Sequence, residues 1–192
     1  MTDPLAQALS QLKPALVRLG IRYVVVGSLA SSARGVYRAT ADGDLLAELS
    51  PGHAGPLAEV LGPDWYADPD MIERSIRDRR SFNIIHIPTA QKIDIFPATT
   101  VFHTSQMQRA TPIPVFPGEV AMEFPVASAE DIVLAKLQWY RGGGEVSDRQ
   151  WNDITGLLAT NPDLDTAYLN SWAARLHVED LLAKAVAEVA ND

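Results

Sequence analysis

Cysteine is absent from the 192-residue sequence. The chain therefore forms neither disulfides nor thiolate metal sites, which suits a reducing compartment, and we expect a cytoplasmic protein. Long apolar runs are also missing, because none approaches the ~20 residues that a membrane helix needs. The N-terminus has no basic region followed by an apolar stretch, so it does not resemble a signal peptide. These absences predict a protein without a membrane partner.

Acidic residues outnumber basic ones, with 24 aspartates and glutamates, 16 lysines and arginines, and a net charge of −8. This balance argues against a protein that coats nucleic acid by neutralising phosphates, but it leaves room for cationic ligands such as metal ions. A local cluster of arginines is most simply a solvated surface, or else it grips an RNA acceptor or nucleotide phosphates: Arg74, Arg77, Arg79 and Arg80. The histidines are scattered without ligand spacing, and we assign none to a metal: His53, His86, His103 and His177.

The hydrophobic pattern predicts an α/β (α+β) protein. Leucines at alternating four- and three-residue steps between residues 5 and 19 indicate an amphipathic helix that Pro14 should kink or split. The apolar run 21–26 predicts a buried strand, followed by a short helix over 28–35 and a second strand over 40–49. Residues 57–80 should hold two short helices.

The second half of the chain changes from strands to helices. Residues 81–87 and 91–98 predict a hairpin, and two proline-broken strands between 112 and 126 should lie at a sheet edge. From Ser128 the pattern is helical, with Ser128 and Ser147 at capping-box-like starts. We expect the aromatic residues of this part to be core: Trp139, Tyr140, Trp151 and Trp172. The sequence thus predicts a core over 1–126 and a helical region over 127–192 packed on it.

Two aspartates one residue apart raise the question of function. In a strand over 40–49, Thr40, Asp42 and Asp44 point to one side, because residues two apart share a face and lie about 6.6 Å apart. Carboxylates this close raise each other's pKa unless a cation lies between them. Oxygen ligands without cysteine or paired histidines favour a hard ion such as Mg²⁺. The alternative is an exposed turn, since Ala-Asp-Gly-Asp is also typical of turns.

Two further features accompany the aspartates. Asp94 is a lone acid in the apolar stretch Lys-Ile-Asp-Ile-Phe, which is typical of an outward-facing strand position or of a third carboxylate beside a metal ion. Gly27 and Ser28 follow the first strand, where a helix start presents unpaired N–H groups that can bind phosphate. Gly27 allows close approach to the backbone, and the Ser28 hydroxyl adds a donor.

Together these residues resemble the polymerase-beta-like nucleotidyltransferase superfamily. Its pattern is an apolar strand, Gly-Gly or Gly-Ser, a short spacer, Asp-x-Asp, and a third acid on a later strand. The matching positions are Gly27-Ser28, a spacer of thirteen residues, Asp42-Gly43-Asp44, and Asp94. Arg38 and Thr40 are similar to the Arg-x-Thr-x-Asp-x-Asp form of small bacterial branches. Residues 130–158 resemble the helical segment of the branch that includes toxin components of toxin–antitoxin pairs.

The resemblance spans residues 21 to 158 and implies a nucleotidyltransferase-like mixed sheet flanked by helices, with a C-terminal helical extension. It implies transfer of a nucleoside monophosphate from a nucleoside triphosphate to an acceptor hydroxyl, with Mg²⁺ (or Mn²⁺) as cofactor. Asp42, Asp44 and Asp94 would be the catalytic and metal-binding residues, with Asp94 as the base for the hydroxyl. The residues implied in nucleotide and phosphate binding are Gly27, Ser28, Arg38, Thr40 and Lys136.

Two residues leave alternatives open. Lys136 is the only charge in an apolar helical stretch, and it either snorkels to solvent, contacts phosphate, or pairs with Asp148 or Asp153. Gly43 departs from the superfamily pattern, which usually has a bulky aliphatic residue between the two aspartates. A glycine in a strand can mark a bulge, which would turn Asp42 and Asp44 away from a common face.

The acceptor stays open among a small molecule such as an aminoglycoside, an RNA end, and a protein hydroxyl. The leading interpretation is a Mg²⁺-dependent nucleotidyltransferase. The alternative is a non-catalytic nucleotide- or partner-binding module of a toxin–antitoxin pair, with a degenerate metal site and a cognate partner protein.

Overall fold

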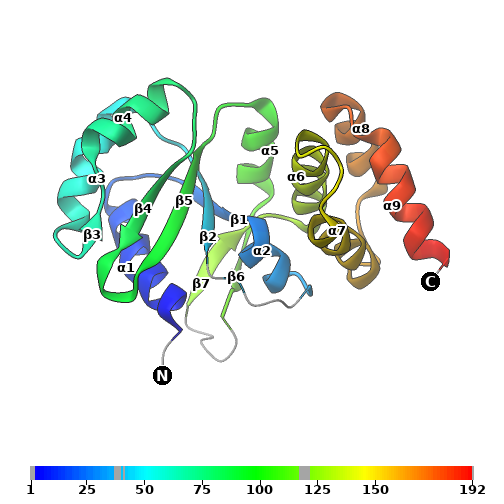
Figure 1. Ribbon diagram of the computed structural model, residues 1–192, viewed down its shortest axis with the longest axis horizontal. Helices are drawn as coiled ribbons and strands as arrows, with labels where there is room; N and C mark the ends of the chain where they lie inside the picture. The colour runs from blue at the N-terminus through cyan, green and yellow to red at the C-terminus, as the bar shows by residue number, and fades with distance from the viewer. Residues whose placement is uncertain (1–2, 37–39, 41, 117–121, 192) are drawn as a thin grey trace.

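The structure is a computed structural model that describes residues 3–36, 40, 42–116 and 122–191. Within these residues, seven strands form one mixed sheet in the order β3-β4-β5-β2-β1-β7-β6, and helices surround it (Figure 1). The strands are β1 (Tyr23–Val26), β2 (Gly43–Ala47), β3 (Trp65–Tyr66), β4 (Phe82–His86), β5 (Gln91–Pro97), β6 (Thr111–Pro114) and β7 (Glu123–Val126). The α/β class expected from the sequence is confirmed.

The helices alternate with the strands in the first half of the chain and follow one another in the second half. They are α1 (Pro4–Arg18), α2 (Gly27–Ala33), α3 (Ala54–Leu61), α4 (Pro69–Arg77), α5 (Val101–Arg109), α6 (Ala129–Gly142), α7 (Asp148–Thr160), α8 (Thr166–Leu176) and α9 (Glu179–Asn191). Short 3₁₀ turns are η1 (Pro51–His53) and η2 (Ile87–Thr89). Among the described residues, no helix is long and apolar enough to cross a bilayer.

Helix α1 continues through Pro14, so of the two expected effects of this proline, a kink or a split, the split does not occur. Asp3 caps the helix by accepting hydrogen bonds from the backbone N–H groups of Leu5 and Ala6. Its leucine stripe is buried in the core, as the spacing predicted. This burial outweighs the one backbone hydrogen bond that a proline removes from the helix interior.

The sheet follows the predicted hairpin and edge, with one addition. β4 and β5 pair in antiparallel fashion around η2, which confirms the hairpin. The two proline-containing strands form one edge region, with β6 outermost and β7 between β6 and β1. The break predicted between α3 and α4 contains β3, which pairs with β4 and was missed because a two-residue strand has no pattern of its own.

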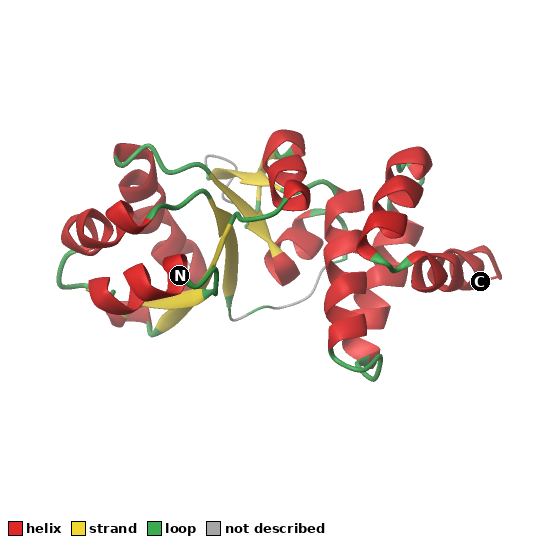
Figure 2. Cartoon of the chain, turned by 90° about the horizontal axis from the view of Figure 1, so that it is seen from above, coloured by secondary structure: helices red, strands yellow, loops and turns green. Residues whose placement is uncertain are grey.

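The C-terminal helices gather at one side of the sheet (Figure 2). Ser128 and Ser147 cap α6 and α7 by accepting the backbone N–H of Asp131 and Gln150, so both predicted helix starts are confirmed. Helix α6 is buried along most of its length, and its apolar side chains belong to the same hydrophobic core as those of the sheet. The helical region therefore closes over the sheet at one side.

Candidate active site

Strand register places two of the predicted acids side by side. β2 and β5 pair in parallel, with Asp44 directly opposite Asp94. On the outer sides of this pair, Val26 of β1 is opposite Asp44 and Asn83 of β4 is opposite Asp94. Paired residues on adjacent strands project to the same face, so Asp44 and Asp94 form the acidic centre of one row across the sheet.

Asp42 and Thr40 lie just outside the sheet. β2 begins at Gly43, so the predicted strand over 40–49 is shorter than expected, and Asp42 is an exposed residue at its entrance. The Thr40 hydroxyl donates a hydrogen bond of 3.1 Å to the backbone carbonyl of Asp42. Asp42 is still close enough for its negative charge to act on Asp44. The predicted phosphate residue Arg38 lies outside the described residues.

Burial and like charge both act on the Asp44 carboxyl. Burial, followed by the negative charge of Asp94, raises the pKa of Asp44 to about 6. The charge of Asp42 also contributes to this rise, while a hydrogen bond from the Ser28 backbone N–H and the charge of Lys92 oppose it. The three acids thus accumulate negative charge that the protein neutralises only in part.

Lys92 is the cation of this group, and sequence reasoning did not assign it. Its Nζ lies 2.7 Å from Oδ2 of Asp94, which stands two residues later on the same face of β5. The available signal was the Lys-x-Asp spacing within the strand. Among the described residues, no group of three or more histidine, aspartate or glutamate side chains converges as a metal-holding set. Lys92 is therefore the partner of Asp94 in the structure.

Gly27 brings the backbone directly against Asp44. A Cβ atom at Gly27 would lie 2.1 Å from Asp44 Oδ2, and the residue has a φ of +63°, so only glycine fits this position. The next residue, Ser28, directs its backbone N–H at the same carboxylate. The sequence predicted a close approach at Gly27, and the structure shows that the approaching group is the Asp44 carboxylate.

Gly43 marks no bulge, so that interpretation of the departure from the superfamily pattern is wrong. β2 pairs residue by residue with β5 from Gly43 to Ala47. A Cβ atom at Gly43 would lie 2.9 Å from Ile93 Cδ1 and 3.2 Å from Leu5 Cδ1. These side chains fill the space behind the strand that an aliphatic residue would otherwise take, so the strand stays regular.

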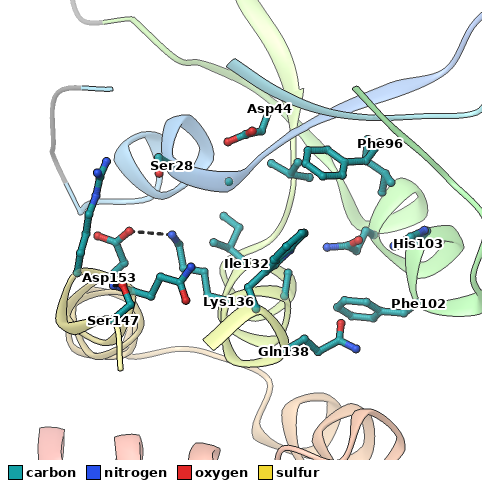
Figure 3. A pocket seen from close by; sticks show the side chains of 18 residues that line it. Ser28, Asp44, Phe96, Phe102, His103, Ile132, Lys136, Gln138, Ser147 and Asp153 are labelled. Carbon is teal, nitrogen blue, oxygen red and sulfur yellow. Dashed lines mark hydrogen bonds and ion pairs between the residues drawn. The ribbon is translucent and has the colours of Figure 1, made fainter. Parts of the chain in front are cut away.

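A cleft of about 570 Å³ opens beside the acids, between the sheet and helices α5, α6 and α7 (Figure 3). Gly27, Ser28 and Asp44 lie at one end of it. Its other lining residues come from three sources: Val26, Leu46 and Phe96 of the sheet; Phe102, His103 and Gln106 of α5; and Ile132, Ala135, Lys136, Gln138, Trp139, Ser147, Arg149, Gln150 and Asp153 of the C-terminal region. Asp42, Asp94 and Thr40 are outside this lining.

Lys136 pairs with Asp153, one of the two partners that the sequence left open. The Nζ–Oδ2 distance is 2.7 Å, and the two residues are 8% and 4% exposed. The pair joins α6 to α7 in the wall of the cleft, on the side of Ser28 (Figure 3). The snorkelling alternative is therefore wrong, because the ammonium group is buried.

Trp139 corrects the expectation that the aromatic residues of the helical region are core. Tyr140 and Trp151 are buried, and Trp172 is partly buried, but Trp139 is 62% exposed. Trp139 lies three residues after Lys136, so both side chains occupy one face of α6. That spacing was readable in the sequence, but nothing local indicated which face of α6 turns to the cleft.

The arginines of the basic cluster are all exposed, as a solvated surface requires. Arg77 forms an ion pair with Glu73 one helical turn earlier on α4. Exposed pairs of this kind contribute about 0.3–0.5 kcal/mol. The cluster is not part of the cleft lining.

No protein-family profile matches the chain, and no curated protein matches it either. Solved structures do share its fold. The solution structure of the antibiotic-resistance factor ANT(2'')-Ia matches with a TM-score of 0.52 and 14% identity, over 90% of this chain and 95% of that one. The crystal structure of ANT(2'')-Ia in complex with adenylyl-2''-tobramycin gives 0.53 and 14%, over 91% and 98%.

A third match is an antigenic nucleotidyltransferase-like protein from Paracoccidioides brasiliensis. It has a TM-score of 0.55 and 16% identity, over 96% of this chain and 93% of that one. The matches cover nearly the whole of each chain, so the likeness includes the C-terminal helices as well as the sheet. These matches show that the chain has the fold of nucleotidyltransferase-like proteins.

Proposed function

We propose that this protein is a nucleotidyltransferase that moves a nucleoside monophosphate from a nucleoside triphosphate to an acceptor hydroxyl. The observation that supports it best is that Asp44, at the end of the cleft and against Gly27, pairs with Asp94 on the neighbouring strand. A purely structural role would not favour two carboxylates side by side, with the pKa of one raised to about 6 by burial and by the other.

The acids fit a divalent cation in donor chemistry and in charge. They offer only oxygen ligands, and together they hold more negative charge than Lys92 neutralises. Asp42, Asp44 and Asp94 would hold Mg²⁺ or Mn²⁺. When bound, the cation supplies charge neutralisation for the triphosphate and a lower pKa for the acceptor hydroxyl.

The remaining chemistry belongs to side chains and backbone of the site. The acceptor oxygen forms a bond to the α-phosphorus, the bond to the bridging oxygen breaks, and pyrophosphate leaves. Asp94 accepts the proton of the acceptor hydroxyl, and Lys92 holds that carboxylate in place. Gly27, Ser28 and Thr40 are the proposed phosphate contacts at the acid end, and Lys136 is the proposed contact in the cleft wall. Arg38, which lies outside the described residues, is proposed from the sequence resemblance alone. Most of the rate gain comes from positioning and charge stabilisation.

A non-catalytic nucleotide-binding module is the second candidate, and one observation favours it. Lys92 forms an ion pair with Asp94, and among the described residues no three histidine, aspartate or glutamate side chains converge to hold a metal ion. In such a module the cleft binds nucleotide, but no bond to phosphorus is made. The resemblance of residues 130–158 also implies a toxin–antitoxin pair, and co-purification of a tight partner protein would show it.

One assay separates the two candidates. Each nucleoside triphosphate is incubated with Mg²⁺ or Mn²⁺ and with pools of RNA, aminoglycosides and proteins, and pyrophosphate release is measured. The variants Asp44→Asn and Asp94→Asn should lower release by about 10²–10⁴-fold, and chelation of the divalent cation should abolish it. Asp163→Asn, an exposed acid on a loop, is the matched control and should leave release unchanged. Nucleotide binding without release in the wild type supports the module, and no binding at all contradicts both candidates.

A further inference from the structure

The floor of the cleft turns apolar directly beyond the acids. Leu46 and Phe96 follow Asp44 and Asp94 by two residues on β2 and β5, and both line the cleft. Residues two apart on a strand share a face and lie about 6.6 Å apart. A ligand with a phosphate at the acids therefore has its next groups over an apolar surface.

Aromatic rings wall this part of the cleft. Trp139 meets Phe96 edge to face, with ring centroids 6.2 Å apart and an interplanar angle of 73°. Phe102 of α5 lines the same region (Figure 3). Most of the Trp139 surface is solvent-accessible, although burying an indole is normally favourable. An open aromatic face inside a cleft is suited to stacking with a planar ring.

Two polar side chains of α5 accompany the rings. Gln106 is only 3% exposed and lines the cleft, and its side-chain amide makes no hydrogen bond within the part of the chain that the structure describes. Because Gln106 lines the cleft, its side-chain amide can offer a ligand both a donor and an acceptor. His103 Nδ1 accepts the Thr99 backbone N–H at 3.1 Å, which leaves Nε2 as the donor of the neutral ring. Burial lowers the pKa of His103 and so favours that neutral form.

The charges of the lining exclude a polycation from this end. The carboxylates of the cleft are Asp44 and Asp153, and Lys136 and Arg149 balance them in number. Asp153 is moreover paired with Lys136. A ligand of several positive charges needs an excess of carboxylates, whereas a flat, uncharged, hydrogen-bonding ring matches what is present.

From these contacts we infer that the aromatic end of the cleft, formed by Phe96, Phe102, Gln106 and Trp139, binds the nucleobase of the donor nucleotide. The base stacks on Trp139, and Gln106 with His103 bonds its polar edge. Lys136 and Trp139 share one face of α6, so one nucleotide can reach both with its phosphates and its base. This inference rests on the proposed function, because it assigns the donor's phosphates to the acid end.

The test uses tryptophan fluorescence and calorimetry on the full chain with Mg²⁺. Titration with ATP, GTP, CTP and UTP should quench the fluorescence, while inorganic triphosphate should bind without quenching it. Trp139→Phe should retain nucleotide affinity but lose most of the quenching. Trp139→Ala should weaken nucleotide binding about five- to hundredfold and leave the affinity for inorganic triphosphate unchanged. Trp65→Phe, a buried residue of β3 away from the cleft, is the matched control and should preserve the quenching.

Gln106→Leu tests the polar edge separately, and it should reduce the differences in affinity among the four nucleotides. Circular dichroism checks that each variant is folded. If Trp139→Ala binds nucleoside triphosphates as tightly as the wild type while pyrophosphate is still released, the base site is wrong and the transferase stands. If Trp139-dependent binding is found without any pyrophosphate release, the transferase is wrong and the base site stands.

Discussion

At the scale of single residues, Asp44 shows the conflict between a stable fold and a charged site. Its carboxylate is half-buried against Gly27 and next to Asp94, and both burial and like charge oppose its ionisation. The folded protein therefore binds the proton of Asp44 more tightly than the unfolded chain does. Above the pKa of the folded state, ionised Asp44 lowers the free energy of unfolding.

This gives a prediction for Asp44→Asn. A pKa of about 6 in the folded state stands well above the ordinary value of 3.8. The penalty therefore grows as the pH rises from about 4 to 6 and is complete at pH 7. Without divalent cations, the variant should be about 1–3 kcal/mol more stable than the wild type at pH 7. The difference should vanish below about pH 4, where the wild-type carboxyl is protonated.

The measurement is urea unfolding of both proteins between pH 3.5 and pH 8, a range chosen around the expected ~4–6 transition. Asp163→Asn serves as the exposed control and should show no such pH-dependent difference. Added Mg²⁺ should stabilise the wild type more than Asp44→Asn, because the variant lacks one carboxylate ligand. A variant that is less stable than the wild type at pH 7 would contradict the prediction.

At the scale of elements, the contact between α6 and α7 joins structure to the cleft. The buried pair of Lys136 and Asp153 links these helices within the cleft wall. A buried ion pair is costly to break, because the remaining charge has lost its partner, but a pair of apolar residues can replace it with little loss. Replacing both residues therefore tests whether Lys136 binds phosphate without a large loss of stability.

For the pair we predict unequal effects of single and double substitution. Lys136→Met should lower the free energy of unfolding by roughly 3–5 kcal/mol, since it leaves the Asp153 carboxylate without the ammonium group. Lys136→Met combined with Asp153→Leu should recover most of that loss. If Lys136 also contacts phosphate, as proposed, the stable double variant should still bind inorganic triphosphate more weakly than the wild type. Chemical unfolding and calorimetry measure the two effects, and unchanged triphosphate binding would limit Lys136 to a structural role.

At the scale of the whole molecule, the sheet and the C-terminal helices share one hydrophobic core. Ile132, Val133, Leu134 and Leu137 of α6 are each no more than 2% exposed, and they belong to the cluster that includes β1 and β2. The sheet and the C-terminal helices both contribute to the cleft, because Asp44 comes from the sheet and much of the wall comes from α6 and α7. The division at residues 126 and 127 thus separates two regions of the sequence that complete a single site.

The shared core predicts one cooperative unfolding transition. Far-UV circular dichroism follows the whole chain, whereas fluorescence follows mainly the helical region, which holds Trp139, Trp151 and Trp172. The two signals should change at the same urea concentration, with coincident midpoints. Two separate midpoints would show that the helical region is an independently stable domain, as the boundary seen in the sequence alone would allow.

Much of the fold could be predicted because its signals are local. The leucine stripe of α1, the serine caps of α6 and α7, and the alternation of β4 and β5 each depend on neighbours within a few residues. The exceptions are β3, the late start of β2 at Gly43, and the unbroken α1 at Pro14. In these places, contacts with remote segments outweigh the local preference.

The sequence by itself determined the acids, the Gly27-Ser28 corner and the class of fold, because those depend on residue type and short spacing. Only the tertiary structure decided that Asp94 lies opposite Asp44, that Lys92 holds Asp94, and that Ile93 and Leu5 fill the space behind Gly43. It also decided that Trp139 faces the cleft and not the core. The physical reason is that strand register and helix orientation minimise the free energy of the whole packed core, which no short stretch of sequence contains.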